Sequence, residues 1–275
     1  FLHADFSNTF ASYSKEFAPT LEEQSRFDAI WRKVREDFAK ERIPFVVLEE
    51  GCPQFPKQNG KEKVHFLYVA GNLSALGQKR VVFLGTSMPS LQGKADTLEA
   101  VTEAVRENCT ILAPFDLGLG AYALSCALKE GGKAVAFLSS GISKCPSEGL
   151  LELMEQVYKK GLLVTQFSPA VKAEKWHVVL RNRFLGSFAE AAFLGEEKDG
   201  GPSWPIFDGV ATANRPTMIP LSLGSNANFS WCGERLEKGS LPYTKARDIR
   251  KLFPSTSSSA PRKEKAVDLT PDLFL

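Results

Sequence analysis

The segment Trp176–Arg183 concentrates the side chains best suited to bind an anion. Two arginines flank an asparagine there, and Trp176 begins the segment. Guanidinium groups bind phosphate through paired hydrogen bonds and stack on bases, and aromatic rings give bases a platform. The candidates for contacting phosphate or nucleic acid are Lys175, Arg181, Asn182 and Arg183. The alternative is a solvated basic helix end that forms ion pairs with neighbouring glutamates.

Two short turns rich in hydroxyl groups follow apolar runs that are typical of strands. The turns consist of Gly85, Thr86 and Ser87, and of Ser139, Ser140 and Gly141. Small residues leave backbone N–H groups accessible and the hydroxyls add donors, a combination that suits a phosphate. Because ligands of an open parallel sheet meet the carboxyl ends of its strands, we expect both turns to form one anion pocket.

No pattern in the sequence indicates catalysis. The dinucleotide motif G-x-G-x-x-G, the P-loop, G-x-S-x-G and H-E-x-x-H are all missing from the sequence. His177 has no acid or nucleophile near it in the sequence, which favours a packing or contact role. The 5 cysteines and 3 histidines lack the short spacing of a zinc site. We therefore expect a binding protein that is not an enzyme and that holds no cofactor or metal.

The charges nearly cancel along the chain, since 34 Lys+Arg and 32 Asp+Glu give a formal net charge of +2. An anionic partner must therefore meet a local basic patch. The stretch 234–265 has 9 basic and 4 acidic residues, so its local charge is 9 − 4 = +5. This charge either attracts a polyanion or only keeps a tail of the chain soluble. No run reaches the ~18 apolar residues of a membrane span, and no secretory signal pattern opens the sequence. These features predict a cytoplasmic protein with no membrane partner.

Short apolar runs alternate with helical patterns between residues 81 and 223. The runs are continuously apolar, as in strands that are covered on both faces. The predicted strands are Val81–Leu84, Ile111–Ala113, Ala134–Leu138, Leu162–Phe167, Ala191–Leu194 and Met218–Leu221. The predicted helices between the first five are Asp96–Glu107, Gly118–Glu130, Ser147–Lys160 and His177–Ala189. The pattern predicts an α/β fold with a doubly wound, mostly parallel sheet and helices on both faces.

The regions outside this alternation suggest three parts of the chain. Residues 1–42 form an N-terminal helical segment, because Thr20 and Glu23 make a capping box before an apolar stripe. Residues 43–245 form the main domain, which begins with short strands and ends with a helix near Phe229–Lys238. The segment Lys198–Pro205 predicts a loop in place of a crossover helix. Residues 246–275, with a Ser-rich stretch and no apolar period, are expected to be a flexible tail.

Seven short motifs lie in order along residues 43–240. They are Pro53–Pro56, Phe66–Asn72, Val81–Ser87 with Pro89, Ser90 and Gly93, Gly131–Leu138, Gly161–Phe167, Arg181-Asn182-Arg183 and Cys232–Gly239. Their order and spacing resemble the DprA/Smf family of DNA-processing proteins. The resemblance implies a Rossmann-like fold, binding of single-stranded DNA, homodimer formation and help in loading RecA during DNA recombination and natural transformation. Phosphates would then lie over both turns, held by Arg181 and Arg183, with Lys175 steering and Trp176 offering a base platform.

The chain departs from the family pattern at several positions. The family arginine of the first turn is Ser87, and its glycine-rich second turn becomes Ala113–Gly120, which contains Asp116. The family glutamate after the fourth strand is Gln166, and the helix start expected between Lys198 and Asn214 has no counterpart. Losing a cation and gaining an acid lower the attraction for phosphate. A nucleotide- or phosphometabolite-binding module that has lost DNA binding, and a scaffold that acts only through protein interactions, therefore remain as alternatives.

Overall fold

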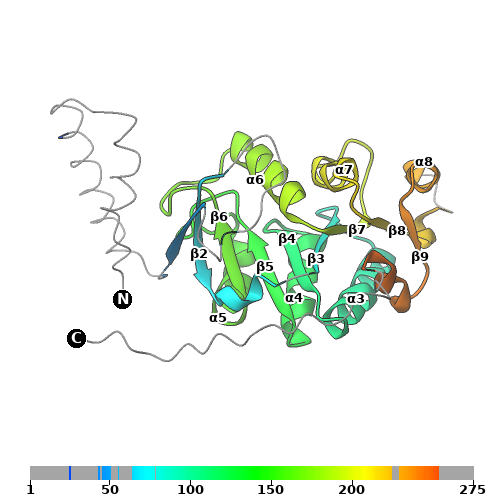
Figure 1. Ribbon diagram of the computed structural model, residues 1–275, viewed down its shortest axis with the longest axis horizontal. Helices are drawn as coiled ribbons and strands as arrows, with labels where there is room; N and C mark the ends of the chain where they lie inside the picture. Colours follow the sequence, from blue (N-terminus) through cyan, green and yellow to red (C-terminus); the bar gives the residue numbers. More distant parts are fainter. Residues whose placement is uncertain are drawn as a thin grey trace, which may run out of the picture.

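A nine-stranded sheet forms the centre of the computed structural model, in the order β1-β2-β6-β5-β4-β3-β7-β8-β9 (Figure 1). The structure describes residues 45–50, 64–77, 79–224 and 229–253, together with positions 25, 43 and 55. The helix predicted within residues 1–42 and the Ser-rich stretch of the tail fall outside the described residues. The strands are β1 (Val46–Glu49), β2 (Phe66–Gly71), β3 (Arg80–Gly85), β4 (Thr110–Pro114), β5 (Lys133–Phe137), β6 (Leu162–Thr165), β7 (Ala191–Glu196), β8 (Thr217–Pro220) and β9 (Leu241–Tyr243).

The pairing is parallel from β6 across to β9, while β1 and β2 pair antiparallel with each other and β2 pairs antiparallel with β6. Helices cover both faces: α3, α4 and α5 lie on one side of the sheet and α6, α7 and α8 on the other (Figure 1). They span α3 (Leu91–Arg106), α4 (Leu119–Lys129), α5 (Leu151–Lys160), α6 (Lys175–Phe188), α7 (Trp204–Thr212) and α8 (Trp231–Glu237). The predicted fold class is confirmed. None of the helices in the described part of the chain has the length and apolarity to cross a bilayer.

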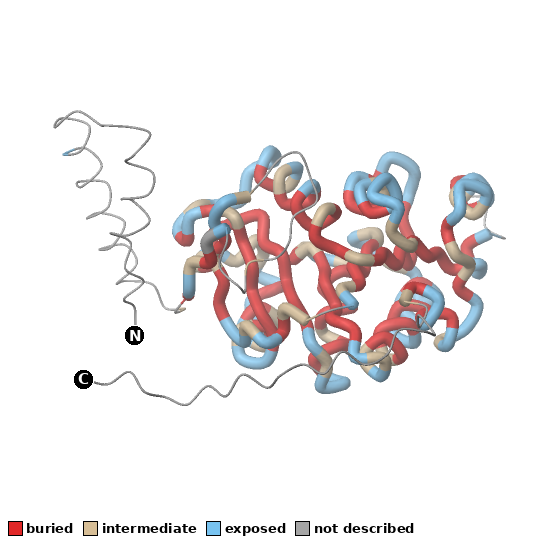
Figure 2. Tube along the Cα trace, in the orientation of Figure 1, coloured by how far each residue is buried: buried red, intermediate tan, exposed pale blue. Residues whose placement is uncertain are grey.

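The side chains of the continuously apolar strands belong to two separate hydrophobic cores. Val81 and Phe83 of β3 pack into the core under α3, α4 and α5, whereas Val82 and Leu84 pack into the core under α6, α7 and α8. Successive side chains of a strand point to opposite faces, so a strand between two helix layers must be apolar at every position. Figure 2 shows the strands as buried segments between helices that expose their outer faces.

The loop predicted at Lys198–Pro205 ends earlier than expected, because Trp204 and Pro205 already belong to α7. Proline is well suited to the first helical turn, where its missing N–H would have no partner. Ile206 and Phe207 are fully buried in the core beneath α6 and α7, so tertiary packing stabilises this helix. The predicted absence of a helix between Lys198 and Asn214 is therefore wrong.

The predicted tail also begins too early. Residues Ala246–Leu252 form the 3-10 helix η5, in which Ile249 and Leu252 are buried in the core under α3. Arg250 fixes η5 to α3 through ion pairs to Glu103 at 2.9 Å and Glu107 at 2.9 Å. The packed domain therefore extends to at least residue 252.

The strand order places a topological switch between β3 and β7. The chain adds β4, β5 and β6 on one side of β3, crosses the sheet through α6, and then adds β7, β8 and β9 on the other side. The loops that follow β3 and β7 leave the sheet in different directions at such a point, and ligands of doubly wound proteins bind there. The register between β3 and β7 shifts between Leu84 and Gly85, directly at this edge.

Candidate functional site

The predicted first turn, Gly85–Ser87, leads away from the switch point and packs against the start of α4. The Thr86 N–H donates to the Glu196 carbonyl at 2.7 Å, and the Leu119 N–H donates to the Thr86 carbonyl at 3.1 Å. Gly118 stands beside this turn at a φ of +112°, and a Cβ there would lie 2.2 Å from the Thr86 oxygen. Ser87 is exposed, so it is the member of the turn that presents its side chain to solvent.

The first turn of α3 already holds an anion, the carboxylate of Glu196. Its Oε2 accepts hydrogen bonds from the Ser90 N–H at 3.1 Å and the Ser90 hydroxyl at 2.6 Å. The Ser90 Oγ in turn accepts from the Gly93 N–H at 3.0 Å, which caps the helix. Helix N-termini attract negative charge because their first N–H groups point outward. Glu196 is only 8 % exposed and already accepts from both donors of Ser90, so a phosphate at this helix start would have to displace it.

Glu196 was not among the site residues predicted from the sequence. The available signal was the pair Glu196-Glu197, which closes an otherwise apolar strand at its carboxyl end. Glu197 is 1 % exposed and accepts from the N–H groups of Lys198 at 3.0 Å and Ser203 at 3.2 Å. Both acids therefore satisfy backbone donors of the loops at the switch point.

Glu196→Ala is expected to lower the free energy of unfolding by about 1 kcal/mol, because Ser90 and the first turn of α3 lose a charged acceptor. Added sulfate is expected to raise the melting temperature of this variant more than that of the native chain, since sulfate can enter the vacated position. Thermal unfolding followed by circular dichroism at increasing sulfate measures both effects. The matched control is Glu152→Ala, an exposed acid in the first turn of α5. Equal sulfate responses of both variants would contradict the interpretation.

The predicted second turn, Ser139–Gly141, is buried. The Gly141 N–H donates to the Val171 carbonyl at 2.8 Å, and the Thr165 hydroxyl donates to the Ser140 carbonyl at 2.8 Å. A Cβ on Gly141 would lie 2.1 Å from the Ser168 oxygen, so the segment 168–171 lies directly on this turn. The two predicted turns therefore do not share one open pocket, and phosphate binding by Ser139, Ser140 and Gly141 stays a prediction.

Arg181 is 3 % exposed and binds protein atoms with all three of its nitrogens. Its Nη2 donates to Asp116 Oδ2 at 2.6 Å, its Nη1 to the Phe137 carbonyl at 3.3 Å and its Nε to Asn182 Oδ1 at 2.8 Å. The Asn182 amide donates to the Pro202 carbonyl at 3.2 Å. Because α6 crosses the sheet, these two side chains connect it to the loops after β4, β5 and β7. Phosphate contact by Arg181 and Asn182 stays a prediction, and their observed contacts are structural.

Trp176 and Arg183 lie on the solvent side of α6. Trp176 is 54 % exposed and Arg183 is exposed, and Val179 between them is also exposed. Positions three to four residues apart share one face of a helix, so these three side chains form a continuous stripe. Lys175, at the first position of α6, is exposed beside this stripe. We call these four residues the α6 face.

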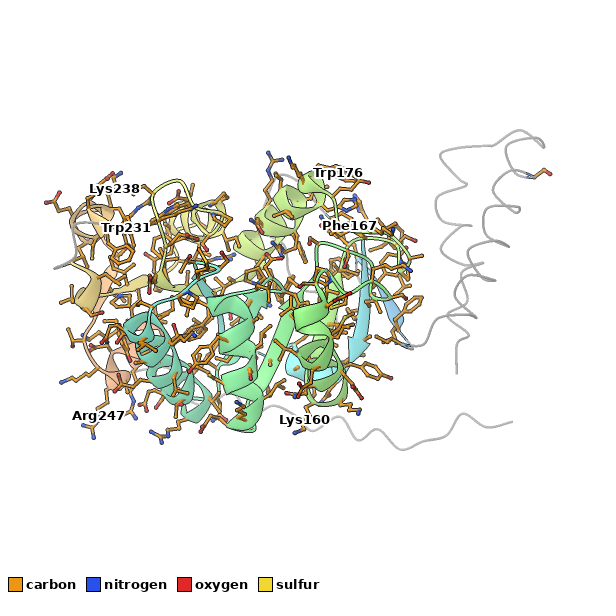
Figure 3. The ribbon with its side chains drawn as sticks, turned by 180° about the vertical axis from the view of Figure 1, so that it is seen from behind. Lys160, Phe167, Trp176, Trp231, Lys238 and Arg247 are labelled. Atoms are coloured by element: carbon orange, nitrogen blue, oxygen red, sulfur yellow. The ribbon has the colours of Figure 1, made fainter. Side chains whose placement is uncertain are left out.

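Neighbouring side chains fix the orientation of the Trp176 ring. Its Nε1–H donates to Glu174 Oε2 at 2.8 Å, and its ring packs edge-on against His177 at 3.9 Å and Phe167 at 6.0 Å between centroids. Figure 3 shows Trp176 at one end of α6, with Phe167 close to it. His177 is buried and accepts from the Glu174 N–H at 3.2 Å, in a capping box. The packing role expected for His177 is confirmed.

The described residues contain no group of three or more His, Cys, Asp and Glu side chains placed to hold a metal ion. Burial raises the pKa of the Cys109 thiol to about 11, against a minor opposing effect of Lys79. Burial also raises the pKa of Cys126 and Cys232. These thiols stay protonated near neutral pH and are poor nucleophiles.

The sequence matches the family model of DNA recombination-mediator protein A over residues 46–252. It is 24 % identical to DNA processing protein DprA of Bacillus subtilis over 137 residues, which are 49 % of this chain and 46 % of that protein. It is 25 % identical to DprA of Streptococcus pneumoniae over 214 residues, 78 % of this chain and 75 % of that protein. The chain thus aligns with less than half of the Bacillus protein's length.

Two solved structures share the fold. The X-ray structure of DprA from Streptococcus pneumoniae superposes with a TM-score of 0.69 at 19 % identity, covering 79 % of this chain and 76 % of that one. DprA from Helicobacter pylori, whose structure was described for its mode of binding single-stranded DNA, gives a TM-score of 0.69 at 17 % identity. This match covers 77 % of this chain and 96 % of that chain. The Rossmann-like architecture is therefore common to all three.

Proposed function

The chain belongs to the DNA recombination-mediator protein A family, and from that premise we propose that it binds single-stranded DNA through the α6 face. Relatives in this family are named DNA processing proteins, and one structural neighbour is described as binding single-stranded DNA. The observation that carries the proposal is the half-exposed, oriented ring of Trp176 between Lys175 and Arg183. The competing phosphometabolite interpretation has no specific observation in its favour.

The half-exposed ring of Trp176 is a surface on which a base can stack. Every base has a π-face, and stacking on an aromatic side chain contributes roughly 1–3 kcal/mol per base without sequence preference. The hydrogen bond to Glu174 and the packing on His177 reduce the freedom of the ring before a ligand arrives. A ring that is already ordered loses less conformational entropy on binding.

Lys175 and Arg183 supply the charge for the phosphate backbone. They lie eight residues apart on α6, so about 12 Å of helix separates their Cα atoms. Single-stranded DNA releases counterions when cations replace them, which makes its binding sensitive to salt. The chain has a net charge of only +2, so local cations of this kind must carry the attraction. Ser87 and the other members of the first turn are proposed as a weaker contact, because Glu196 occupies the adjacent helix start.

The same premise supports further parts of the proposal. We expect a role as a recombination mediator without enzymatic activity, a homodimer, a contact with RecA and a cytoplasmic location. Light scattering measures the dimer, and co-purification with RecA on single-stranded DNA measures the contact.

Trp176→Ala is expected to weaken binding of a fluorescently labelled oligo-dT at least about fivefold, through the loss of base stacking. Arg183→Ala is expected to weaken binding and to flatten the dependence of log K on log salt by about 0.7, the value for one single-strand phosphate contact. Fluorescence anisotropy at a low and a moderate salt concentration measures both. Arg183→Ala should change the melting temperature by no more than a degree or two, since its side chain is exposed. Trp176→Ala is expected to lower it further, through the lost contacts with Glu174 and His177, so binding is compared well below both melting temperatures.

Two substitutions on the opposite helix layer serve as matched controls. Leu151→Ala removes an apolar side chain of α5 that is as exposed as Trp176, and Arg106→Ala removes an exposed arginine of α3. Both controls should bind oligo-dT like the native chain. The proposal is refuted if the native chain fails to bind oligo-dT at low salt, or if the α6 variants bind as well as the controls.

A further inference from the structure

A groove of about 870 Å³ lies where β8 and β9 begin, at the edge of the sheet opposite to the Gly85–Ser87 turn. Residues of α7, α8 and η5 form its walls together with the turn before β8. The residues that characterise it are Arg215, Arg235, Lys238, Lys251, Thr217 and Ser240, and we call it the basic groove. Its volume is within the range of protein sites for small ligands.

The charge of the groove lining is mostly positive. Four cations line it, and Asp208 is the lining residue with a negative charge. Lys238 and Lys251 pair with Glu234 and Asp248, which do not line the groove. The lining by itself has a balance of 4 − 1 = +3, and Glu234, Asp248 and Glu190 offset part of this charge from outside the groove.

The two arginines are held in fixed positions. Arg235 pairs with Asp208, and its guanidinium lies 4.4 Å from the centre of the Trp204 ring. Arg215 donates to the carbonyls of Ser187 and Ala189 at the end of α6, and the nearby carboxylate of Glu190 partly offsets its charge. A fixed guanidinium loses little entropy when it binds a phosphate.

A buried pair of hydroxyl groups belongs to the lining of the groove. Thr217 and Ser240 are 5 % and 8 % exposed, and their oxygens lie 2.9 Å apart. One hydroxyl donates to the other, so the proton of the second remains for a further acceptor. A phosphate oxygen would provide that acceptor.

We propose that the basic groove is a second phosphate site, which binds the backbone of the same DNA strand that stacks on Trp176. This inference rests on the proposed function. The aromatic residue in the groove lining, Phe207, is fully buried, and the Arg235 guanidinium lies over its ring, so the lining offers no base platform. It therefore recognises phosphate rather than bases.

The helix α6 connects the two sites. Trp176 lies at its first turn, and Arg215 binds carbonyl groups at its last turn. The 14 residues of α6 span about 21 Å, so a strand that follows the α6 face reaches the groove at its far end. Figure 3 shows Trp176 on α6, and Lys238 and Trp231 near the other end of the same helix layer.

The length of the DNA provides the test. An oligo-dT of about two nucleotides is too short to span the ~21 Å of α6 between Trp176 and the groove, whereas one of about twenty covers both. The variant Lys238→Gln/Lys251→Gln removes two cations, and Ala211→Glu places an acid in the groove without removing a contact. The matched control is Lys159→Gln, whose lysine forms an exposed (i, i+4) pair on α5 like that of Lys238 on α8.

Both groove variants are expected to weaken binding of the long oligo-dT about fivefold at low salt, and to leave the short one unchanged. The double variant should also flatten the salt slope by up to about 1.4, twice the single-strand value. Inorganic pyrophosphate is expected to raise the melting temperature of the native chain and of the Lys159→Gln control, and less so that of the double variant.

Each outcome decides one question. If the long oligo-dT binds equally to the native chain and to both groove variants, the second site is refuted, while sensitivity to Trp176→Ala keeps the proposed function. If pyrophosphate stabilises the chain through the groove but the long oligo-dT is unaffected, the groove binds free phosphate compounds and the assignment to DNA is overturned. If the native chain binds no oligo-dT, the proposed function fails, and the DNA site in the groove fails with it.

Discussion

Arg181→Ala is expected to lower the free energy of unfolding by about 3 kcal/mol, the scale for removing one partner of a buried charged pair. The substitution breaks three hydrogen bonds at once and leaves Asn182 Oδ1 without this donor, while the Phe137 carbonyl keeps its hydrogen bond from the Phe115 N–H. Asp116 is half-exposed and can be hydrated, so the loss is less than for a fully buried pair. Urea unfolding followed by circular dichroism measures the change.

The neighbouring Arg183→Ala provides the matched control, because it removes the same side chain from an exposed position of the same helix. Its expected effect on stability is about 0.5 kcal/mol or less. Arg181→Met should recover part of the loss, since an apolar side chain fills the space without leaving a charge unpaired. If Arg181→Ala unfolds like the native chain but no longer binds oligo-dT, Arg181 is a ligand residue, as its type and position in the sequence suggested.

Gly118→Ala is expected to destabilise the chain by about 3 kcal/mol, from a strained backbone and a steric clash together. Gly118 has a φ of +112° and a ψ of −148°, a region that is accessible almost only to glycine. The added Cβ would lie 2.2 Å from the Thr86 oxygen and 2.5 Å from the Ser87 Cα, and both of these are backbone atoms. The turn after β3 must therefore move away from the start of α4.

Substitutions at two other glycines distinguish the cost of backbone strain from the cost of a steric clash. Gly131 has a φ of +71° with no atom within 4 Å of an added Cβ, so Gly131→Ala should cost only about 1 kcal/mol. Gly233, within α8, has neither a positive φ nor a close neighbour, and Gly233→Ala should be neutral or stabilising. In thermal unfolding, the loss of stability should increase from Gly233→Ala through Gly131→Ala to Gly118→Ala. A loss for Gly118→Ala no greater than that for Gly131→Ala would show that the turn moves freely.

Acidic side chains of the chain itself occupy two positions that suit phosphate. Asp116 binds the buried guanidinium of Arg181, and Glu196 binds the first turn of α3. Of the two donors, Arg181 was a candidate for an anionic ligand in the sequence, whereas Ser90 was not. The proposed DNA contact therefore lies on the outer side of α6 rather than at the carboxyl edge of β3.

The fold could be predicted from the sequence because its signals are local. A strand between two helix layers must be apolar at every position, and β3, β4 and β5 show this over four to six residues. The wrong predictions concern elements whose stability comes from packing. The helix α7 begins with Trp204 and Pro205 after a Gly- and Pro-rich turn, and η5 is fixed by Ile249 and by the ion pairs of Arg250.

The residue types at the candidate site were also determined by the sequence, including the arginine pair and the tryptophan beside it. Only the tertiary structure decided which of them face solvent. Arg181 and Arg183 are two residues apart, and a helix turns by about 200° over that distance, so one points into the protein and the other away from it. Which of the two turns inward depends on the path of α6 across the sheet, and that path results from contacts between residues far apart in the chain.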